Sequence, residues 1–377
     1  MESKVEFLKQ SLLYQMSLGS KELYHSNVWA WLIENDPAFI KAFVPDFDDN
    51  TYEIVEHEPE YKHVLREYNH RDIIIWLHKK GSDEKCFYVI ENKIKSLQSE
   101  SQLKDYSENL GDYTMLGGVV TGIRNALNSE EILLKKNDDG KVNFKWKFVS
   151  YKDICQNIIC ILQTSTQPVI KNHKSQITEY CQIIDAIYNV IEEAMSENDK
   201  RLNYTYPSYL ADLRLQDVFV KLKGSDFMKY VSDRKAELEA LCPEGFGLRL
   251  NQSFHNRKAT LDIRYTNLKK VGDDWIGIQL EQNQYRIVVY QSDSHDKQRI
   301  FDMYKCIWFD SEFDKSAHER MLFKKYPTAM KKEFDCYGEQ FVYQYYNIDK
   351  DNNDYETIFN NIVEDLKRAE VVLKSVQ

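Results

Sequence analysis

The sequence predicts two domains. An α/β domain over residues 1–200 has helices flanking a mixed sheet, and an α+β domain covers residues 201–377. The first half orders its expected elements as helix, three strands, helix and strand, an alternation typical of α/β folds. A polar stretch without periodicity, residues 196–208, separates the halves. The 377 residues are enough to build more than one hydrophobic core.

Helical spacing of apolar residues predicts the helices of the first half. A helix is expected over 5–18, and a second one over 21–35 ends before Pro37, which cannot continue it. The same spacing predicts further helices over 97–110, 152–163 and 173–195.

Short apolar and alternating runs predict the strands. Residues 71–78 contain three successive isoleucines, and residues 142–151 alternate with Val142, Phe144 and Trp146 on one face. The strands expected in the first half are 51–58, 71–78, 86–94, 115–122 and 142–151.

The second half predicts helices first and strands afterwards. Helical patterning covers about 209–240, and an amphipathic helix carrying Ile358, Ile362 and Leu366 comes near the end. Between them lie five runs that favour an antiparallel sheet, 246–251, 258–266, 275–281, 285–291 and 305–310.

Composition limits the function classes. A formal net charge of −10 argues against coating nucleic acid through charge alone, although it leaves a local basic groove open. Seven cysteines without a CxxC pair indicate reduced thiols and a cytoplasmic protein. The N-terminus is charged and amphipathic, unlike a signal peptide, and no apolar run approaches the roughly 20 residues that span a membrane.

The strands 71–78 and 86–94 carry the most informative residues. The turn-rich link "KKGSDEK" between them predicts a hairpin folded about residues 81–82. Counting outward from this turn places Asp72 opposite Glu91, at a Cβ separation of about 4.5–5.5 Å. The two-residue period of a strand puts Lys93 on the same face as Glu91 and turns Asn92 to the other face.

Two facing carboxylates repel each other unless a cation lies between them. Hard oxygen ligands suit Mg²⁺, which takes one or two carboxylates and completes its shell with water and phosphate. A neighbouring lysine can orient or deprotonate the attacking water, or stabilise charge on a phosphate. The alternative is structural: Glu91 and Lys93 form a solvent-exposed pair on an edge strand, and Asp72 merely begins its strand.

The stretch "HRDIIIWL…FYVIENKIKS" resembles the active-site hairpin of the PD-(D/E)xK nuclease superfamily. The order of elements over roughly residues 20–125 is similar to its αβββαβ, restriction-endonuclease-like core. One departure is Arg71, which stands where the family has a proline. The resemblance implies that Asp72 and Glu91 are metal ligands, that Lys93 is the catalytic lysine, and that the Asn92 backbone carbonyl is a further ligand.

The resemblance also implies an acidic metal ligand on the first core helix, which Glu22 matches. The alternative for Glu22 is a first-turn carboxylate favoured by the helix dipole. His25 reads more simply as a packed or solvated residue, and Ser26 as an N-cap of the run that follows it.

The helix after the hairpin carries Gln102 and Tyr106, which lie four residues apart and therefore on one face. "SQLKDY" resembles the Q-x-x-x-Y pattern that follows the catalytic strand in several branches of the superfamily, where the pair lies at the rim of the site. The alternative is that Tyr106 packs against Leu103 and Leu110. The acidic residues of strand 51–58, including Glu53, are expected to lie at a solvated edge of the sheet.

The sequence therefore predicts a Mg²⁺-dependent nuclease, with Mn²⁺ as an alternative metal, that hydrolyses phosphodiester bonds in nucleic acid, DNA by family resemblance. The rival prediction is a binding or assembly protein that keeps the nuclease fold without turnover. The intact set of Asp72, Glu91 and Lys93 argues against the rival, whereas the overall charge favours it. No membrane partner is expected, and a homo-oligomer or a protein partner is left open.

Overall fold

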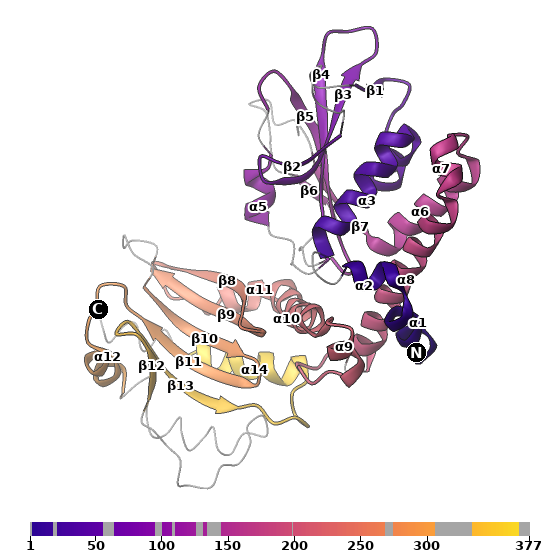
Figure 1. Ribbon diagram of the computed structural model, residues 1–377. Helices are drawn as coiled ribbons and strands as arrows, with labels where there is room; N and C mark the ends of the chain where they lie inside the picture. The colour runs from indigo at the N-terminus through magenta and orange to yellow at the C-terminus, as the bar shows by residue number, and fades with distance from the viewer. Residues whose placement is uncertain are drawn as a thin grey trace. The chain divides into compact units, whose positions relative to one another are not determined.

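The computed structural model describes residues 2–17, 21–55, 64–94, 100–107, 110–125, 131–133, 145–197, 199–267, 274–305 and 334–368 (Figure 1). The chain divides into two compact units. The first comprises Met1–Ala194 and Pro207–Val218, and the second comprises Met195–Tyr206 and Phe219–Gln377. The chain thus crosses between the units after Ala194, after Tyr206 and again after Val218.

The first unit is built on a mixed sheet. Its strands are β1 (Tyr52–Ile54), β2 (Val64–Tyr68), β3 (Arg71–Lys79), β4 (Lys85–Glu91), β5 (Thr114–Gly122), β6 (Glu131–Leu133) and β7 (Lys145–Ser150). The order is β1-β3-β4-β5-β7-β6, and β2 also pairs with β3. The β4–β5 and β5–β7 pairs are parallel and the others antiparallel. The predicted α/β class with a mixed sheet flanked by helices is confirmed.

The strands differ from the predictions in several places. Strand β2 was not predicted, and it joins β3 through a two-residue turn in which Asn69 and His70 both have positive φ. Strand β4 ends at Glu91 rather than 94, because the Asn92 N–H donates to the Asp72 carboxylate instead of to a strand. Of the strand predicted over 51–58, residues 51–55 are described and contain β1, whereas residues 56–58 lie outside the described ranges. Strand β6 was not predicted, and of the strand predicted over 142–151 the described part forms β7, whereas residues 142–144 lie outside the described ranges.

Helices flank both faces of this sheet (Figure 1). The helix predicted over 5–18 is interrupted at Ser11, whose hydroxyl accepts the Tyr14 N–H and so begins a second helix. The helices of the first unit are α1 (Glu2–Gln10), α2 (Leu12–Ser17), α3 (Lys21–Asn35), η1 (Pro37–Phe39), α4 (Ile40–Phe43), α5 (Glu100–Asp105), α6 (Tyr151–Thr164), α7 (Pro168–Asn172), α9 (Ser208–Asp212) and all but the last two residues of α8 (Lys174–Ser196).

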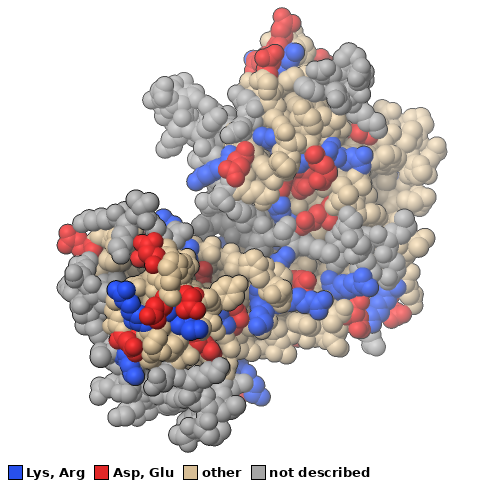
Figure 2. All heavy atoms as spheres, turned by 60° about the vertical axis from the view of Figure 1, so that its left-hand side comes forward, with Lys and Arg blue, Asp and Glu red and all other residues tan. Residues whose placement is uncertain are grey.

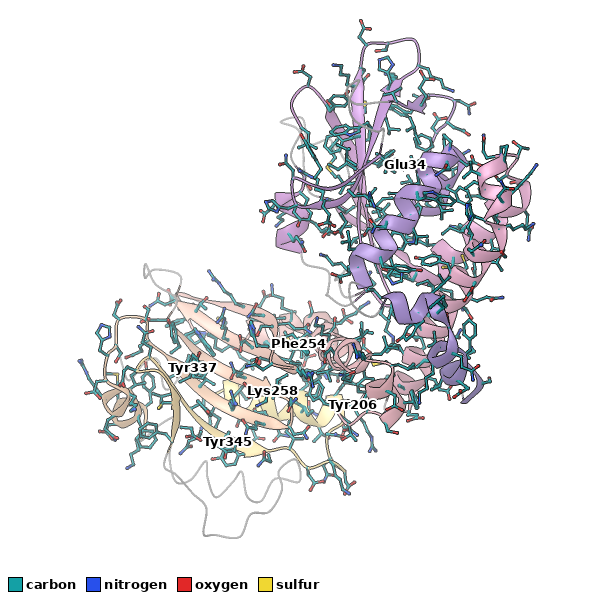
Figure 3. The ribbon with its side chains drawn as sticks, viewed as in Figure 1. Glu34, Tyr206, Phe254, Lys258, Tyr337 and Tyr345 are labelled. Atoms are coloured by element: carbon teal, nitrogen blue, oxygen red, sulfur yellow. The ribbon has the colours of Figure 1, made fainter. Side chains whose placement is uncertain are left out.

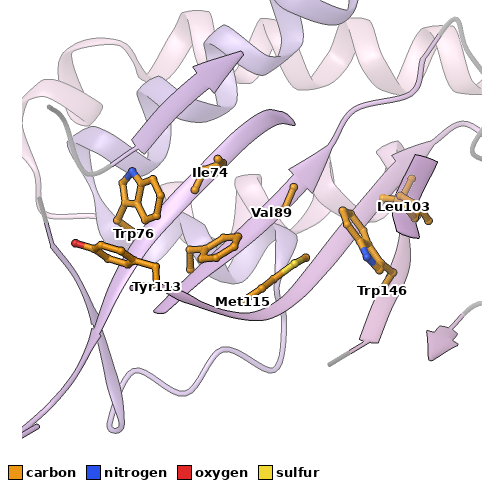
Figure 4. Close-up of a cluster of buried hydrophobic side chains, with 9 residues drawn as sticks. Ile74, Trp76, Val89, Leu103, Tyr113, Met115 and Trp146 are labelled. Atoms are coloured by element: carbon orange, nitrogen blue, oxygen red, sulfur yellow. The ribbon is translucent and has the colours of Figure 1, made fainter. Parts of the chain in front are cut away.

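A hydrophobic cluster lies between the sheet and α5 (Figure 4). The indole of Trp146 on β7 is fully buried, and its Nε1 donates to the Ser107 hydroxyl just after α5. Gly118 on β5 faces this ring, and a Cβ there would lie 2.4 Å from Trp146 Cε3. The cluster comprises Ile74, Trp76, Phe87, Val89, Leu103, Tyr113, Met115, Val120 and Trp146.

The opposite face is covered by α3 and α6, which pack on β2, β3 and β7. Trp29 of α3 and Tyr151 of α6 contact each other with ring centroids 5.1 Å apart, and both side chains are buried. Aromatic contacts of this kind fix α3 laterally against the sheet that carries the candidate site.

The second unit is an antiparallel sheet with helices on one face. Tyr265 and Tyr285 point to this face, where their hydroxyls donate to the Leu238 carbonyl at 2.7 Å and to Asp365 Oδ2 at 2.6 Å. The sheet order is β12-β13-β11-β10-β9-β8. Its elements are α10 (Gln216–Asp233), α11 (Lys235–Glu239), β8 (Phe246–His255), β9 (Lys258–Asn267), β10 (Trp275–Glu281), β11 (Gln284–Tyr290), α12 (Lys297–Tyr304), β12 (Asp335–Tyr337), β13 (Phe341–Asn347) and α14 (Tyr355–Leu366).

Polar and aromatic side chains line the other face of the second sheet. Arg286 forms an ion pair with Glu281 at 2.7 Å and lies over the Tyr343 ring. Tyr345 and Tyr337 are exposed (Figure 3). Of the strand predicted over 305–310, all but the first residue lies outside the described ranges. None of the helices within those ranges combines the length and apolar composition needed to cross a bilayer.

Candidate active site

The β3–β4 hairpin places the two predicted carboxylates side by side. The register pairs His78 with Lys85 and Ile73 with Ile90, so the next pair is Asp72 and Glu91. The turn is centred where the "KKGSDEK" link predicted it. The Asp72 N–H lies 3.5 Å from Glu91 Oε2, and Asp72 Oδ2 accepts the Asn92 N–H at 2.7 Å.

Lys93 joins this pair through Glu91. Its Nζ lies 2.7 Å from Glu91 Oε1, and the two side chains are only 10% and 1% exposed. A solvent-exposed ion pair, the structural alternative, is therefore wrong for Glu91 and Lys93. By contrast, the Lys79–Glu84 pair at the far end of the same hairpin has both side chains more than 40% exposed.

Burial sets the protonation chemistry of the pair. It raises the pKa of Asp72 to about 6, a shift that Glu67 and Glu22 reinforce and that the Asn92 N–H and Lys93 oppose. Burial and the nearby Asp72 charge raise the pKa of Glu91 to about 7, against the opposing effect of Lys93. Without a further positive charge, the two carboxylates do not both ionise easily at neutral pH.

Lys93 remains an ammonium in this setting. Burial alone lowers its pKa, but the charges of Glu91, Asp72 and Glu22 outweigh burial and bring the pKa above the ordinary lysine value. The side chain therefore presents a fixed positive charge beside the two carboxylates at neutral pH.

Helix α5 brings Gln102 and Tyr106 to the same place from across the sheet face. Gln102 Nε2 donates to Glu91 Oε1 at 3.2 Å and to the Tyr106 hydroxyl at 2.7 Å. The Tyr106 ring also packs against the hydrophobic cluster between the sheet and α5. The Tyr106 ring thus packs in the core while its hydroxyl accepts from Gln102, and a role for Tyr106 in the site stays a prediction.

Glu22 lies in the first turn of α3, close enough for its charge to act on both Asp72 and Lys93. It does not form a ready-made cage with them, since within the described ranges no three His, Cys, Asp or Glu side chains are arranged to hold a metal. The Asn92 N–H faces Asp72, while its side chain turns to α3 and α6.

Two neighbours on α3 behave as structural residues. His25 is buried, and its Nδ1 lies 3.0 Å from the Tyr180 hydroxyl, so it is a packed histidine. Ser26 is not an N-cap, and that prediction is wrong: α3 already begins at Lys21, and the Ser26 hydroxyl donates to the Glu22 carbonyl within the helix.

The comparison with protein families identifies the family of the chain. The family model described as the PD-(D/E)XK nuclease superfamily matches residues 10–210, more than half of the chain. The chain belongs to the PD-(D/E)XK nuclease superfamily. No curated protein and no solved structure matches it.

Arg71 occupies the position of the superfamily's proline and takes a different structural part. Its guanidinium is buried, donates twice to the Tyr106 carbonyl at 3.0 and 3.1 Å, and donates to the Asn69 carbonyl at 3.4 Å. A cation at a helix C-terminus satisfies free carbonyls and complements the helix dipole. Arg71 thus ties the strand that carries Asp72 to the helix that carries Gln102.

Glu67 is an acidic neighbour that the sequence reading missed. On β2 it lies between Arg66, which pairs with Ile73, and Tyr68, which pairs with Arg71, and so it is opposite Asp72. Its backbone is left-handed, with φ of 54°. The tripeptide Tyr68-Asn69-His70 held the signal for this strand, because asparagine favours the left-handed positions of a two-residue hairpin turn.

The donor set fits the divalent metal that nucleases of this superfamily typically use. Asp72 and Glu91 offer carboxylate oxygens, the ligands that Mg²⁺ prefers. The raised pKa values of this buried pair fit a site that an added positive charge, such as a divalent cation, would stabilise.

Proposed function

We propose that the first unit is a metal-dependent nuclease that hydrolyses phosphodiester bonds in nucleic acid, with DNA as the substrate and Mg²⁺ or Mn²⁺ as the metal. The observation that carries the proposal is the buried contact of Glu91 with Lys93 beside Asp72. Burying two carboxylates and an ammonium together costs folding stability. Their presence in this hairpin is therefore best explained by a catalytic role.

Each side chain has a defined role in this proposal. Asp72, Glu91, the Asn92 carbonyl and Glu22 would hold the metal, which when bound neutralises phosphate charge and activates water. Lys93 is positioned to stabilise negative charge that develops on the scissile phosphate, because it is a fixed ammonium beside the carboxylates. Gln102 holds the Glu91 carboxylate in one orientation, and Tyr106 holds Gln102.

The surface charge is compatible with a local site rather than an extended basic tract. In Figure 2 basic and acidic side chains are interspersed on the face that is drawn. Binding that depends on such a surface would be weak without a metal, since the phosphate backbone dominates nucleic-acid affinity. The metal would therefore contribute to substrate binding as well as to catalysis.

Incubating the protein with supercoiled plasmid, linear duplex and single-stranded DNA, in Mg²⁺ and in EDTA, tests the proposal. We expect cleavage in Mg²⁺ and none in EDTA. Asp72→Asn should abolish this cleavage, whereas Glu53→Gln, at the exposed β1 edge, should retain it. Metal-independent binding of DNA without any cleavage would favour the rival, a binding protein that keeps the nuclease fold.

A further inference from the structure

We infer that the Asn92 side chain is a positioning residue, which holds the first turn of α3, and with it Glu22, against Asp72, Glu91 and Lys93. This inference rests on the proposed function, because it gives Glu22 its place beside the metal. Asn92 occupies the middle position of the "ENK" motif, where any displacement reaches Glu91 and Lys93 directly.

The Asn92 amide is fully buried and bonded on both sides. Its Nδ2 donates to the Glu22 carbonyl at 2.8 Å and to the Ser26 hydroxyl at 3.0 Å. On the other side, Oδ1 accepts from the Tyr151 hydroxyl of α6 and lies 3.5 Å from the Thr121 hydroxyl of β5. The single side chain therefore connects α3, β5 and α6 to the motif.

The chemistry of these partners fixes the orientation of the amide. A backbone carbonyl only accepts hydrogen bonds, so the NH₂ group must face Glu22 and the oxygen must face the two hydroxyls. Because the Asn92 N–H also donates to Asp72 Oδ2 at 2.7 Å, one residue holds the metal-site carboxylate through its backbone and α3 through its side chain.

Burying a polar amide here costs desolvation that an apolar side chain would avoid. The compensation is geometric. Bonds to the Glu22 carbonyl and to Ser26, one helical turn later, fix the position of α3 along its own axis relative to the motif. The charge of Glu22 thereby stays close to Asp72 and Lys93.

A double-mutant cycle on metal binding tests the inference. Mn²⁺ would be titrated calorimetrically, without nucleic acid, into wild type, Glu22→Gln, Asn92→Ala and the double variant. Loss of a supporting residue typically weakens metal affinity by about 10- to 100-fold, and Asn92→Ala is expected in that range. Glu22→Gln should weaken binding in wild type but have no further effect in Asn92→Ala, because Glu22 is already misplaced there.

The Asn92→Ala variant keeps its backbone carbonyl, so a lost backbone ligand does not explain a weaker affinity. If this variant fails to fold, Tyr151→Phe takes its place in the cycle, because it removes only the hydroxyl that Asn92 accepts from. Tyr180→Phe is the matched control: it removes a buried hydroxyl that faces His25 instead, and it should leave Mn²⁺ affinity unchanged.

Independent, additive effects of Glu22→Gln and Asn92→Ala would overturn the inference, as would unchanged affinity in either single variant. The proposed function fails in a different way. If the effects of Glu22→Gln and Asn92→Ala on Mn²⁺ binding are coupled but no nucleic acid is cleaved, the nuclease proposal is wrong and the positioning role of Asn92 stands. If nucleic acid is cleaved but the two effects are additive, the nuclease proposal stands and the positioning role is wrong. A wild-type protein that binds no Mn²⁺ would contradict both the proposed function and the positioning role of Asn92.

Discussion

At the scale of single residues, the site combines an ammonium and two carboxylates where the protein would otherwise be apolar. Lys93 is held by Glu91, which is held in turn by Gln102, so each charged atom has a defined neighbour. Such a group is arranged before substrate arrives, which is the condition for efficient electrostatic stabilisation of a transition state.

We expect Lys93→Met to lower the turnover of DNA cleavage by about 100- to 1000-fold, because it removes a charge that acts on the developing phosphate charge. Metal binding should persist, since both carboxylates remain. Lys93→Arg should restore little, because a planar guanidinium does not replace a compact ammonium in a confined site. Single-turnover cleavage and calorimetric metal titration measure the two effects separately.

The control for Lys93 is Lys79→Met, on the same hairpin. Its ion pair with Glu84 is exposed, so its loss should leave both rate and metal affinity unchanged. Full activity in Lys93→Met, or equal losses in both variants, would contradict the proposed role of Lys93.

The raised pKa values of Asp72 and Glu91 predict how stability depends on pH. The folded, metal-free protein keeps protons on these groups that the unfolded chain releases, so its stability should fall as pH rises from about 4 to about 7. Asp72→Asn removes one of the two charges. It should therefore be about 2 kcal/mol more stable than wild type at pH 8 and nearly equal to it at pH 4.

Urea unfolding at both pH values, in EDTA, measures this difference. Adding Mg²⁺ should narrow the gap at pH 8, since a bound cation stabilises wild type alone. A variant that is less stable than wild type at pH 8 would show that the two carboxylates do not repel each other.

At the scale of elements, the β3–β4 hairpin was predictable and its surroundings were less so. The turn residues and the apolar runs on each side fix the register, and thereby the Asp72–Glu91 pair. Strand β2 was not predicted, although Asn69 favours a hairpin turn. Helix α3 has the predicted bounds, but Ser26 lies inside it rather than at its cap. The side-chain partners of Asn92 come from elements far apart in sequence, which local patterns do not reveal.

Strand β5 provides a test of packing beside the site. Gly118→Ala should destabilise the protein by about 2–3 kcal/mol, because its Cβ would strike the Trp146 ring, which is held by Ser107. Gly111→Ala is the comparison: it has open space but a left-handed backbone, and should cost about 1 kcal/mol. Denaturant midpoints of the two variants rank these costs, and the reverse order would contradict the packing.

At the scale of the whole molecule, the sequence predicted two domains with a boundary at 196–208, and this boundary stays a prediction. The structure assigns Pro207–Val218 to the first unit. Leu210, Leu213 and Leu215 are buried there, and the Tyr14 hydroxyl donates to the Leu213 carbonyl at 2.6 Å. The first unit is thus completed by leucines that follow, in the sequence, a segment of the second unit.

A fragment of residues 1–218 should therefore be more stable than one of residues 1–200. Burying three leucines contributes several kcal/mol at about 1.5–3 kcal/mol each, and the shorter fragment lacks all of them. Thermal unfolding of the two fragments compares them directly. Equal midpoints would mean that residues 201–218 contribute nothing to the first unit.

The threefold crossing of the chain also bears on the order of events during synthesis. As the protein emerges from the ribosome, the strands and helices up to Ala194 appear first, followed by a segment that belongs to the second unit, and only then by the leucines of Pro207–Val218. Domains generally fold as units, N-terminal first, while they are being made. Here the apolar surface that Leu210, Leu213 and Leu215 cover stays exposed until those residues have been made, and a pause in translation before that point would leave this surface open to chaperones or aggregation.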